Sequence, residues 1–212
     1  MIQRATEKLL SISSDAISRL ERSYPEELSA FGRLGEELKY LLENRNGFYA
    51  FESALHVFPA AHFSGDMTLG RWNSHGLWKF EYAGMADGKF FFAEDVFGNQ
   101  FCLFGNEIGF FEAETAETQM VASGVEEWAS LILKDYAFQT GYPLVHTWQK
   151  QHGPLSEGQR LMPKIPFVLG GEFKVENLFE IRAISGMKSR GNLARQIKDL
   201  PDGSKIKFEI ID

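Results

Sequence analysis

Residues 92–101 have the sequence FAEDVFGNQF, which predicts two β-strands joined by a tight turn. An acidic residue followed three positions later by glycine is typical of a turn closed by side-chain hydrogen bonds, so Asp95 and Gly98 mark the turn. Phe92 and Phe101 flank it and are expected to anchor the two strands in the core. This stretch therefore places an antiparallel pair of strands near the middle of the chain.

Short aromatic runs separated by glycine surround this stretch and extend the predicted sheet over about residues 48–111. At 78–82, aromatic residues alternate with charged ones, a pattern typical of a strand with one buried face and one wet face. An Asp-Gly pair at 87–88 and a Gly-Asn pair at 105–106 provide turns between neighbouring runs. An antiparallel sheet is the predicted assembly.

Helical periodicity lies on both sides of the predicted sheet. Two N-terminal segments, 12–20 and 28–42, have apolar residues at spacings of three and four, and an Asn-Gly terminator follows the second. A later helix is predicted over 123–136, where Ser123 and Glu126 fit a capping box. Because each helix has an apolar face to bury, we predict an α+β fold with the N-terminal helices and the later helix packed against the sheet.

The chain is predicted to contain one core domain, residues 1–150, followed by a linker and a C-terminal extension, residues 151–212. Residues 140–166 are rich in Gly, Pro, His and Gln, which is typical of a connection. The extension is predicted to be a small α+β unit, with a strand-like run at 173–184, a short helical face at 193–200 and an alternating run at 205–210.

The formal net charge is -7, and the acidity lies in the front of the chain. Residues 1–150 contain 12 Lys and Arg against 21 Asp and Glu, whereas residues 151–212 contain 10 against 8. Phosphate binding requires clustered Lys and Arg, so nucleic acid is not the expected partner. With 44% hydrophobic and 14% aromatic residues, the chain has enough apolar surface to form a large core.

Two further features concern location and redox chemistry. The single cysteine, Cys102, lies in an apolar run and is expected to be a buried core residue rather than a nucleophile. The first residues are mixed polar, and no run approaches the length of a membrane span. We therefore expect a cytoplasmic protein that does not associate with a membrane.

Sequence motifs for catalysis are absent from the chain: it has no phosphate-binding glycine loop, no Gly-x-Ser-x-Gly and no His-Glu-x-x-His. Glu94 and Asp95 are neighbours on a predicted strand, so their side chains point to opposite faces and do not form an acid–base pair. The spacing of the nearest potential ligands fits no single face, so no metal and no other cofactor is predicted. Those potential ligands are His56, His62, Asp66 and His75.

The order of these elements resembles the SUKH superfamily. The most specific part is the string Phe-x-x-Asp-x-x-Gly-x-x-Phe at Phe92, Asp95, Gly98 and Phe101, and the resemblance covers about residues 20–136. The superfamily includes bacterial toxin-immunity proteins, Syd and the yeast cell-wall regulator family. The resemblance implies a protein-binding function without catalysis, and it identifies no binding residue.

Resemblance and charge together predict an immunity protein that neutralises a cognate protein toxin. The toxin is expected to be cationic, since a nuclease must hold phosphates in a basic site. A stretch without Lys or Arg, residues 90–133, supplies the candidate binding carboxylates: Glu94, Asp95, Glu107, Glu112, Glu114 and Glu117. Two alternatives stay open, a regulatory protein-interaction module without a toxin partner and, for this stretch, a solvated acidic face.

Overall fold

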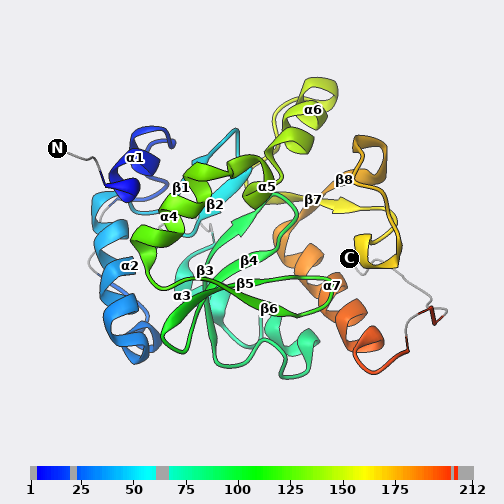
Figure 1. Ribbon diagram of the computed structural model, residues 1–212, viewed down its shortest axis with the longest axis horizontal. Coiled ribbons are helices and arrows are strands. Elements are labelled where there is room, and N and C mark those ends of the chain that lie inside the picture. The colour runs from blue at the N-terminus through cyan, green and yellow to red at the C-terminus, as the bar shows by residue number, and fades with distance from the viewer. Residues whose placement is uncertain (1–3, 20–22, 61–66, 202, 205–212) are drawn as a thin grey trace.

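A computed structural model describes residues 4–19, 23–60, 67–201 and 203–204 of the chain (Figure 1). These residues form a six-stranded antiparallel sheet whose strands are neighbours in chain order, and a separate two-stranded antiparallel sheet. The larger sheet contains β1 (Phe48–Ala50), β2 (Leu55–Val57), β3 (Lys89–Asp95), β4 (Gln100–Phe104), β5 (Glu107–Phe111) and β6 (Thr118–Ala122). The smaller one contains β7 (Gln159–Pro163) and β8 (Leu178–Arg182).

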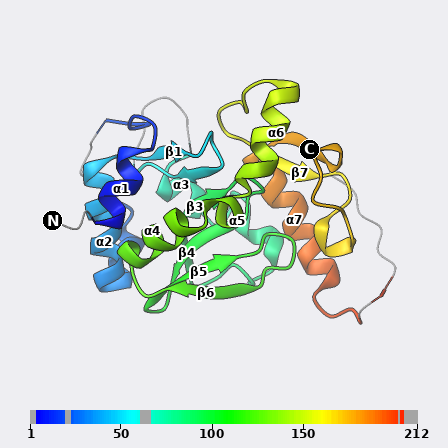
Figure 2. The ribbon, with the colours of Figure 1, turned by 45° about the horizontal axis from the view of Figure 1, so that its top comes forward.

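Helices pack around this sheet and confirm the predicted α+β fold. The N-terminal helices lie on one side of the larger sheet, α4 crosses one of its faces, and α7 lies on the opposite side beside β7 (Figures 1 and 2). The α-helices are α1 (Ala5–Ser11), α2 (Gly32–Asn44), α3 (Leu69–Asn73), α4 (Val125–Lys134), α5 (Tyr136–Thr140), α6 (Tyr142–His152) and α7 (Ala183–Ile197). Four 3₁₀ helices span Glu26–Phe31, Lys79–Tyr82, Phe167–Leu169 and Val175–Asn177.

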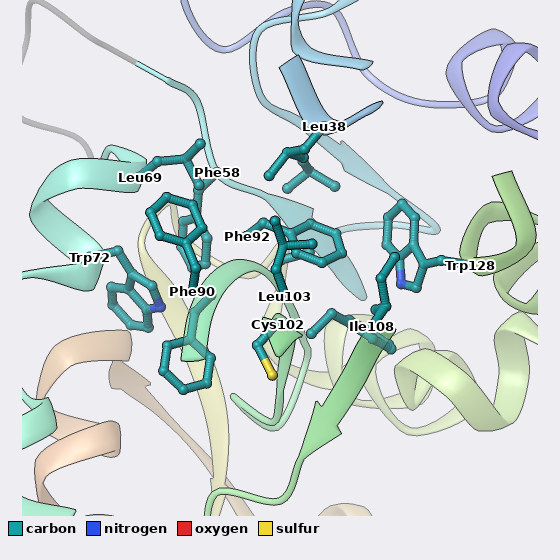
Figure 3. Close-up of a cluster of buried hydrophobic side chains, with 14 of the residues drawn as sticks. Leu38, Phe58, Leu69, Trp72, Phe90, Phe92, Cys102, Leu103, Ile108 and Trp128 are labelled. Atoms are coloured by element: carbon teal, nitrogen blue, oxygen red, sulfur yellow. The ribbon is translucent and has the colours of Figure 1, made fainter. Parts of the chain in front are cut away.

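Both faces of the central strand β3 are covered. Phe92 contacts Trp128 of α4 edge-on, with ring centroids 5.1 Å apart (Figure 3). The next residue back, Phe91, points to the other face and packs against Trp78 at 5.1 Å. A strand buried on both faces has a continuous apolar run instead of an alternating one, which accounts for the three consecutive phenylalanines here.

Cys102 on β4 lies in this core, as predicted. Its side chain is fully buried among apolar neighbours (Figure 3). Burial raises the pKa of the Cys102 thiol to about 12, because the thiolate would lose its hydration there. The residue is therefore a small apolar component of the core.

The strand predicted at 78–82 is wrong, because Lys79–Tyr82 is a 3₁₀ helix. In a helical turn, Trp78 and Tyr82 project from the same side, and their rings meet at 5.5 Å. Phe80 is 42% exposed. The apolar–charged alternation was produced by one helical turn that buries two of its three aromatic rings.

The first predicted helix is displaced towards the N-terminus. Helix α1 ends at Ser11, and the chain then runs beside β1, where the Ser14 amide donates to the Tyr49 carbonyl at 2.7 Å and the Ile17 amide donates to the Gly47 carbonyl at 2.9 Å. Leu20, the last residue of the predicted apolar face, lies outside the described residues. The segment therefore covers the outer edge of β1 instead of forming a second long helix.

The predicted capping box at α4 is also wrong. Ser123 pairs with Glu127, whereas Glu126 accepts a hydrogen bond from the Thr6 hydroxyl at 2.7 Å and so holds the start of α1. The α4 amide of Val125 donates to Glu37 of α2 at 2.9 Å. These carboxylates connect the first turns of α1 and α4 to neighbouring helices.

The region predicted as a linker contains regular structure. Residues 140–166 include α6 and β7, and the predicted domain boundary at residue 150 falls inside α6. Helix α7 begins at Ala183, so it replaces the end of the predicted strand at 173–184 and extends well before the predicted helix at 193–200. The alternating run at 205–210 lies outside the described residues.

Helix α7 belongs to the same core as the larger sheet. Its residues Ala183, Met187 and Ala194 are part of the main buried cluster. The buried face of α7 also contains Gly, Ser and Arg residues, so its hydrophobic periodicity is weak in the sequence. In the described residues, no helix has the length and apolar character needed to cross a membrane.

Candidate functional site

The turn between β3 and β4 has the form that the sequence predicts. Asp95 Oδ1 accepts hydrogen bonds from the amides of Phe97 at 2.8 Å and Asn99 at 2.9 Å. The other oxygen accepts one from the Asn99 side-chain amide at 2.8 Å. Gly98 has a φ of 78°, a backbone conformation that residues with a Cβ adopt only under strain.

We expect Gly98→Val to lower the free energy of unfolding by about 1 to 3 kcal/mol. A Cβ at this position would also lie 3.3 Å from the guanidinium Nη1 of Arg190. Chemical denaturation of the two proteins measures the effect. Gly105→Val is the matched control for the contact with Arg190. Gly105 also has a positive φ, so this variant introduces backbone strain, but its added Cβ has no atom within 4 Å. Wild-type stability in Gly98→Val would contradict the described turn.

Glu94 lies at the centre of a buried charge network. Its Oε1 is 3.0 Å from His56 Nδ1 on β2 and 2.8 Å from Arg160 Nε on β7. The second oxygen, Oε2, accepts a hydrogen bond from Gln100 at 3.2 Å. The side chains of Arg160 and Glu94 are only 2% and 1% exposed. The network therefore joins the larger sheet to the two-stranded sheet through side chains that are almost fully buried.

The electrostatics of Glu94 follow from these contacts. Burial by itself raises the pKa of Glu94, but Arg160, His56 and Gln100 outweigh it and hold the pKa below its ordinary value. The Nε–H of Arg160 does not have hydrogen-bond geometry towards Glu94, so the 2.8 Å contact is an ion pair and not a hydrogen bond. Glu94 is therefore an ionised structural group.

Gln100 and Tyr49 extend the network on either side. Gln100 Oε1 accepts a hydrogen bond from the indole of Trp72 at 2.8 Å, and its amide nitrogen donates to the Gly98 carbonyl at 2.8 Å. Tyr49 stacks on His56 with ring centroids 4.4 Å apart. The Asp95 turn and the Glu94 network are thus connected through one buried glutamine.

A second buried arginine comes from α7. Arg190 donates to the Leu161 carbonyl at 3.1 Å and lies under the Asp95 turn. Burial raises the pKa of Asp95 to about 7, while its hydrogen bonds and Arg190 oppose the rise. Burial likewise raises the pKa of Glu114, against the Val168 amide, which donates to Glu114 at 2.9 Å, and against Arg190. Two C-terminal arginines therefore face three carboxylates of the preceding region.

For three of the six predicted binding residues, the prediction is wrong. Glu94, Asp95 and Glu114 are 1%, 3% and 8% exposed, so they do not form a surface for a partner. Buried carboxylates require partners inside the protein, and here Arg160, Arg190 and backbone amides provide them. The remaining candidates, Glu107, Glu112 and Glu117, are exposed.

Sequence reasoning missed both arginines and Gln100, and it considered His56 only as a potential metal ligand. The only signal was the excess of basic residues after position 150, set against the acidity of the region before it. That contrast indicated a charge asymmetry but not which residues meet. A single Arg inside an irregular apolar pattern has no local signature of burial.

A cleft of about 340 Å³ opens beside the network. Tyr49 and His56 line it together with Arg71 and Arg182. In the part of the chain that the structure describes, no group of three His, Cys, Asp or Glu side chains can hold a metal ion. Of the predicted potential ligands, His56 contacts Glu94, His75 is exposed, and His62 and Asp66 lie outside the described residues.

Comparisons with known proteins give a likeness of fold alone. No model of a protein family matches the sequence, and no curated protein matches it. The chain is similar to the crystal structure of Atu4351 from Agrobacterium tumefaciens, with a TM-score of 0.56, 14% sequence identity and 88% of each chain covered. The architecture described above is therefore shared, over nearly the whole chain, with a bacterial protein of very different sequence.

Proposed function

We propose that this chain is a non-enzymatic, cytoplasmic immunity protein of the SUKH type that binds and neutralises a cationic, nuclease-type protein toxin. The observation that carries the proposal is the exposure of Glu107, Glu112 and Glu117 within a stretch, residues 90–133, that contains no Lys or Arg. Such a surface attracts basic proteins and accelerates their association. The exposed carboxylates lie at the two ends of β5 and just before β6, next to the turns where recognition residues are commonly found.

The exposed glutamates form two groups at opposite ends of the last two strands. Glu112, directly after β5, lies beside Glu117, since the Glu112 amide donates to the Glu117 carbonyl at 2.9 Å. Glu107 begins β5 at the other end, where Glu126 and Glu127 start α4. Within the described ranges, none of the ion pairs involves these five carboxylates, although Lys198 lines the same groove as Glu117. The charge of Glu107, Glu112 and Glu117 is therefore available to a partner, whereas Glu126 and Glu127 also accept hydrogen bonds from Thr6 and Ser123.

The buried carboxylates support a binding role over a catalytic one. A general acid or base must reach a substrate proton. Both oxygens of Glu94 are engaged by His56, Arg160 and Gln100, and both oxygens of Asp95 accept hydrogen bonds within its own turn. These groups stabilise the fold and position the surface strands.

The double variant Glu112→Lys with Glu117→Lys is expected to slow association with the toxin roughly tenfold at low salt without unfolding the protein. The toxin to use is the product of the gene adjacent to the one that encodes this chain. Binding kinetics at several salt concentrations measure the effect, and survival of cells that express the toxin measures protection. Added salt should slow the wild type more than the variant.

A matched control reverses two exposed glutamates elsewhere, Glu43 on α2 and Glu176 in the Val175–Asn177 helix, and so changes the net charge equally. This control should retain most of the association rate. If the Glu112 and Glu117 reversals leave both affinity and salt dependence unchanged, the acidic surface is not the binding face. A neighbouring product that neither binds nor is neutralised would argue for a regulatory module.

A further inference from the structure

The two edges of the larger sheet differ in whether another segment covers them. The outer edge of β1 is covered by residues 14–18, whose amides donate to the β1 side of the sheet. The strand at the other end of the order, β6, pairs with β5 on one side, and no strand of the described residues pairs with its other side. Figure 2 shows β6 along the lower border of the sheet. An open edge presents backbone donors and acceptors that can pair with another chain.

The register identifies which backbone groups face outward. The Glu112 amide donates to the Glu117 carbonyl just beyond the ladder, and within the ladder Phe110 is opposite Gln119. Because bonded and non-bonded pairs alternate in an antiparallel ladder, the amides and carbonyls of Thr118 and Met120 point away from β5. A strand added to β6 would pair with these groups.

The sequence of β6 lacks the Lys and Pro residues that protect many edge strands, although its pairing with β5 shifts register between Ile108 and Gly109. Natural edges commonly carry Lys or Pro, which block pairing with other chains. Residues 118–122 are TQMVA and contain neither, and Met120 is 38% exposed. No Lys, Arg or Pro of β6 itself therefore opposes pairing with an additional strand.

The charges at the two ends of β6 determine which kind of segment can pair with this edge. Glu112 and Glu117 lie before the strand, and Glu126 and Glu127 follow it. Antiparallel pairing of two copies of this chain would bring acidic ends together, which is unfavourable. An extended segment with Lys or Arg at its ends would instead meet opposite charges at both.

We propose that the open edge of β6 is the docking strand for an extended, basic segment of the partner protein, which adds to the sheet as a seventh strand. This inference rests on the proposed function and specifies its mode of recognition. Strand addition obtains affinity from main-chain hydrogen bonds and specificity from side chains at alternate positions. Here, the flanking glutamates supply the preference for a cationic segment.

The test uses two synthetic peptides with the same alternating Thr-Val centre, one with lysines and one with glutamates at its ends. We expect the lysine-flanked peptide to slow hydrogen exchange of the Thr118 and Met120 amides and to bind more weakly as salt is added. The glutamate-flanked peptide should protect neither amide. Two-dimensional NMR of the isotope-labelled full chain reports both amides, and the covered edge at Tyr49 serves as the internal reference.

A variant pair tests the edge independently. Met120→Lys places a charge on the open edge and is expected to weaken binding of the lysine-flanked peptide roughly fivefold or more, the equivalent of about one hydrogen bond. Gln151→Lys in α6 makes the same charge change at an exposed site and should leave binding unchanged. Unaltered exchange at Thr118 and Met120, or equal binding of both peptides, would overturn the proposal.

The same measurement separates this proposal from the proposed function. If the toxin binds and is neutralised while the β6 amides exchange as in the free chain and Met120→Lys binds the toxin normally, strand addition is wrong and the immunity function stands. If the lysine-flanked peptide adds to β6 but the neighbouring gene product does not bind, the edge is a docking strand for a different basic partner.

Discussion

Replacing Arg160 with methionine is expected to lower the free energy of unfolding by about 3 to 5 kcal/mol, because the variant leaves Glu94 buried without its cationic partner. The ion pair is 2.8 Å long and excluded from solvent on both sides. Methionine retains most of the side-chain volume, so the loss of stability comes mainly from the missing charge and less from changed packing. Denaturant titration, or calorimetry if unfolding is reversible, measures the change.

Two further variants test whether the loss of stability comes from the unpaired buried charge. Arg182→Met removes an exposed arginine that forms no ion pair within the described residues, and it should change stability by only about 0.5 kcal/mol or less. Combining Arg160→Met with Glu94→Gln removes the uncompensated charge and should recover part of the loss. Equal stability of Arg160→Met and Arg182→Met would contradict the buried network.

The network also predicts a dependence on acid. The folded state lowers the pKa of Glu94, so its ionised form adds stability above the ordinary glutamate value of 4.5, and this contribution is lost as pH falls through the lowered value. Arg160→Met removes the main cause of the lowered pKa. The difference in stability between wild type and variant should therefore shrink as the solution is acidified.

Trp128→Ala is expected to cost about 3 to 5 kcal/mol, through lost contacts and the cavity that remains. The Trp128 ring meets Phe92 edge-on with centroids 5.1 Å apart (Figure 3). It also meets Phe101 edge-on at 5.7 Å and so joins α4 to the sheet. Phe138→Ala is the matched control, since Phe138 is 81% exposed. That control should lie within about 0.5 kcal/mol of wild type.

Trp128→Phe separates ring volume from polarity. The buried indole nitrogen of Trp128 has no hydrogen-bond partner in the described residues, so phenylalanine removes an unsatisfied donor while it keeps much of the apolar contact. The stability loss should be clearly smaller than for alanine. A loss as large as that of Trp128→Ala would mean that the indole shape, and not apolar burial, determines the packing of α4.

The sheet and its central turn could be predicted because their signals are local. Asp95 and Gly98 form a turn through contacts within four residues, and the aromatic run of β3 is apolar enough to predict burial by itself. The 78–82 strand failed for the same reason that it was predicted: five residues are too few to distinguish alternation from one helical turn. Tertiary packing of Trp78 and Tyr82 decides between the two.

The candidate binding residues were harder to predict, because burial of a charge depends on residues far away in the sequence. Glu94 and Glu112 are both glutamates in the same Lys-free and Arg-free stretch, yet one is buried and the other exposed. The buried one, Glu94, is paired with Arg160, which is distant in the chain. Local charge counts therefore identified the surface glutamates and the buried ones alike.

The position of Arg160 and Arg190 has a consequence for synthesis of the protein. A chain emerges from the ribosome with its N-terminal part first, and domains generally fold as units during that process. Strands β1 to β6 precede both arginines, so Glu94 is made before Arg160, its ion-pair partner, and Asp95 and Glu114 are made before Arg190, which attracts them. Nascent chains stalled before residue 160 should therefore stay sensitive to protease, and resistance should appear only after α7 has left the exit tunnel.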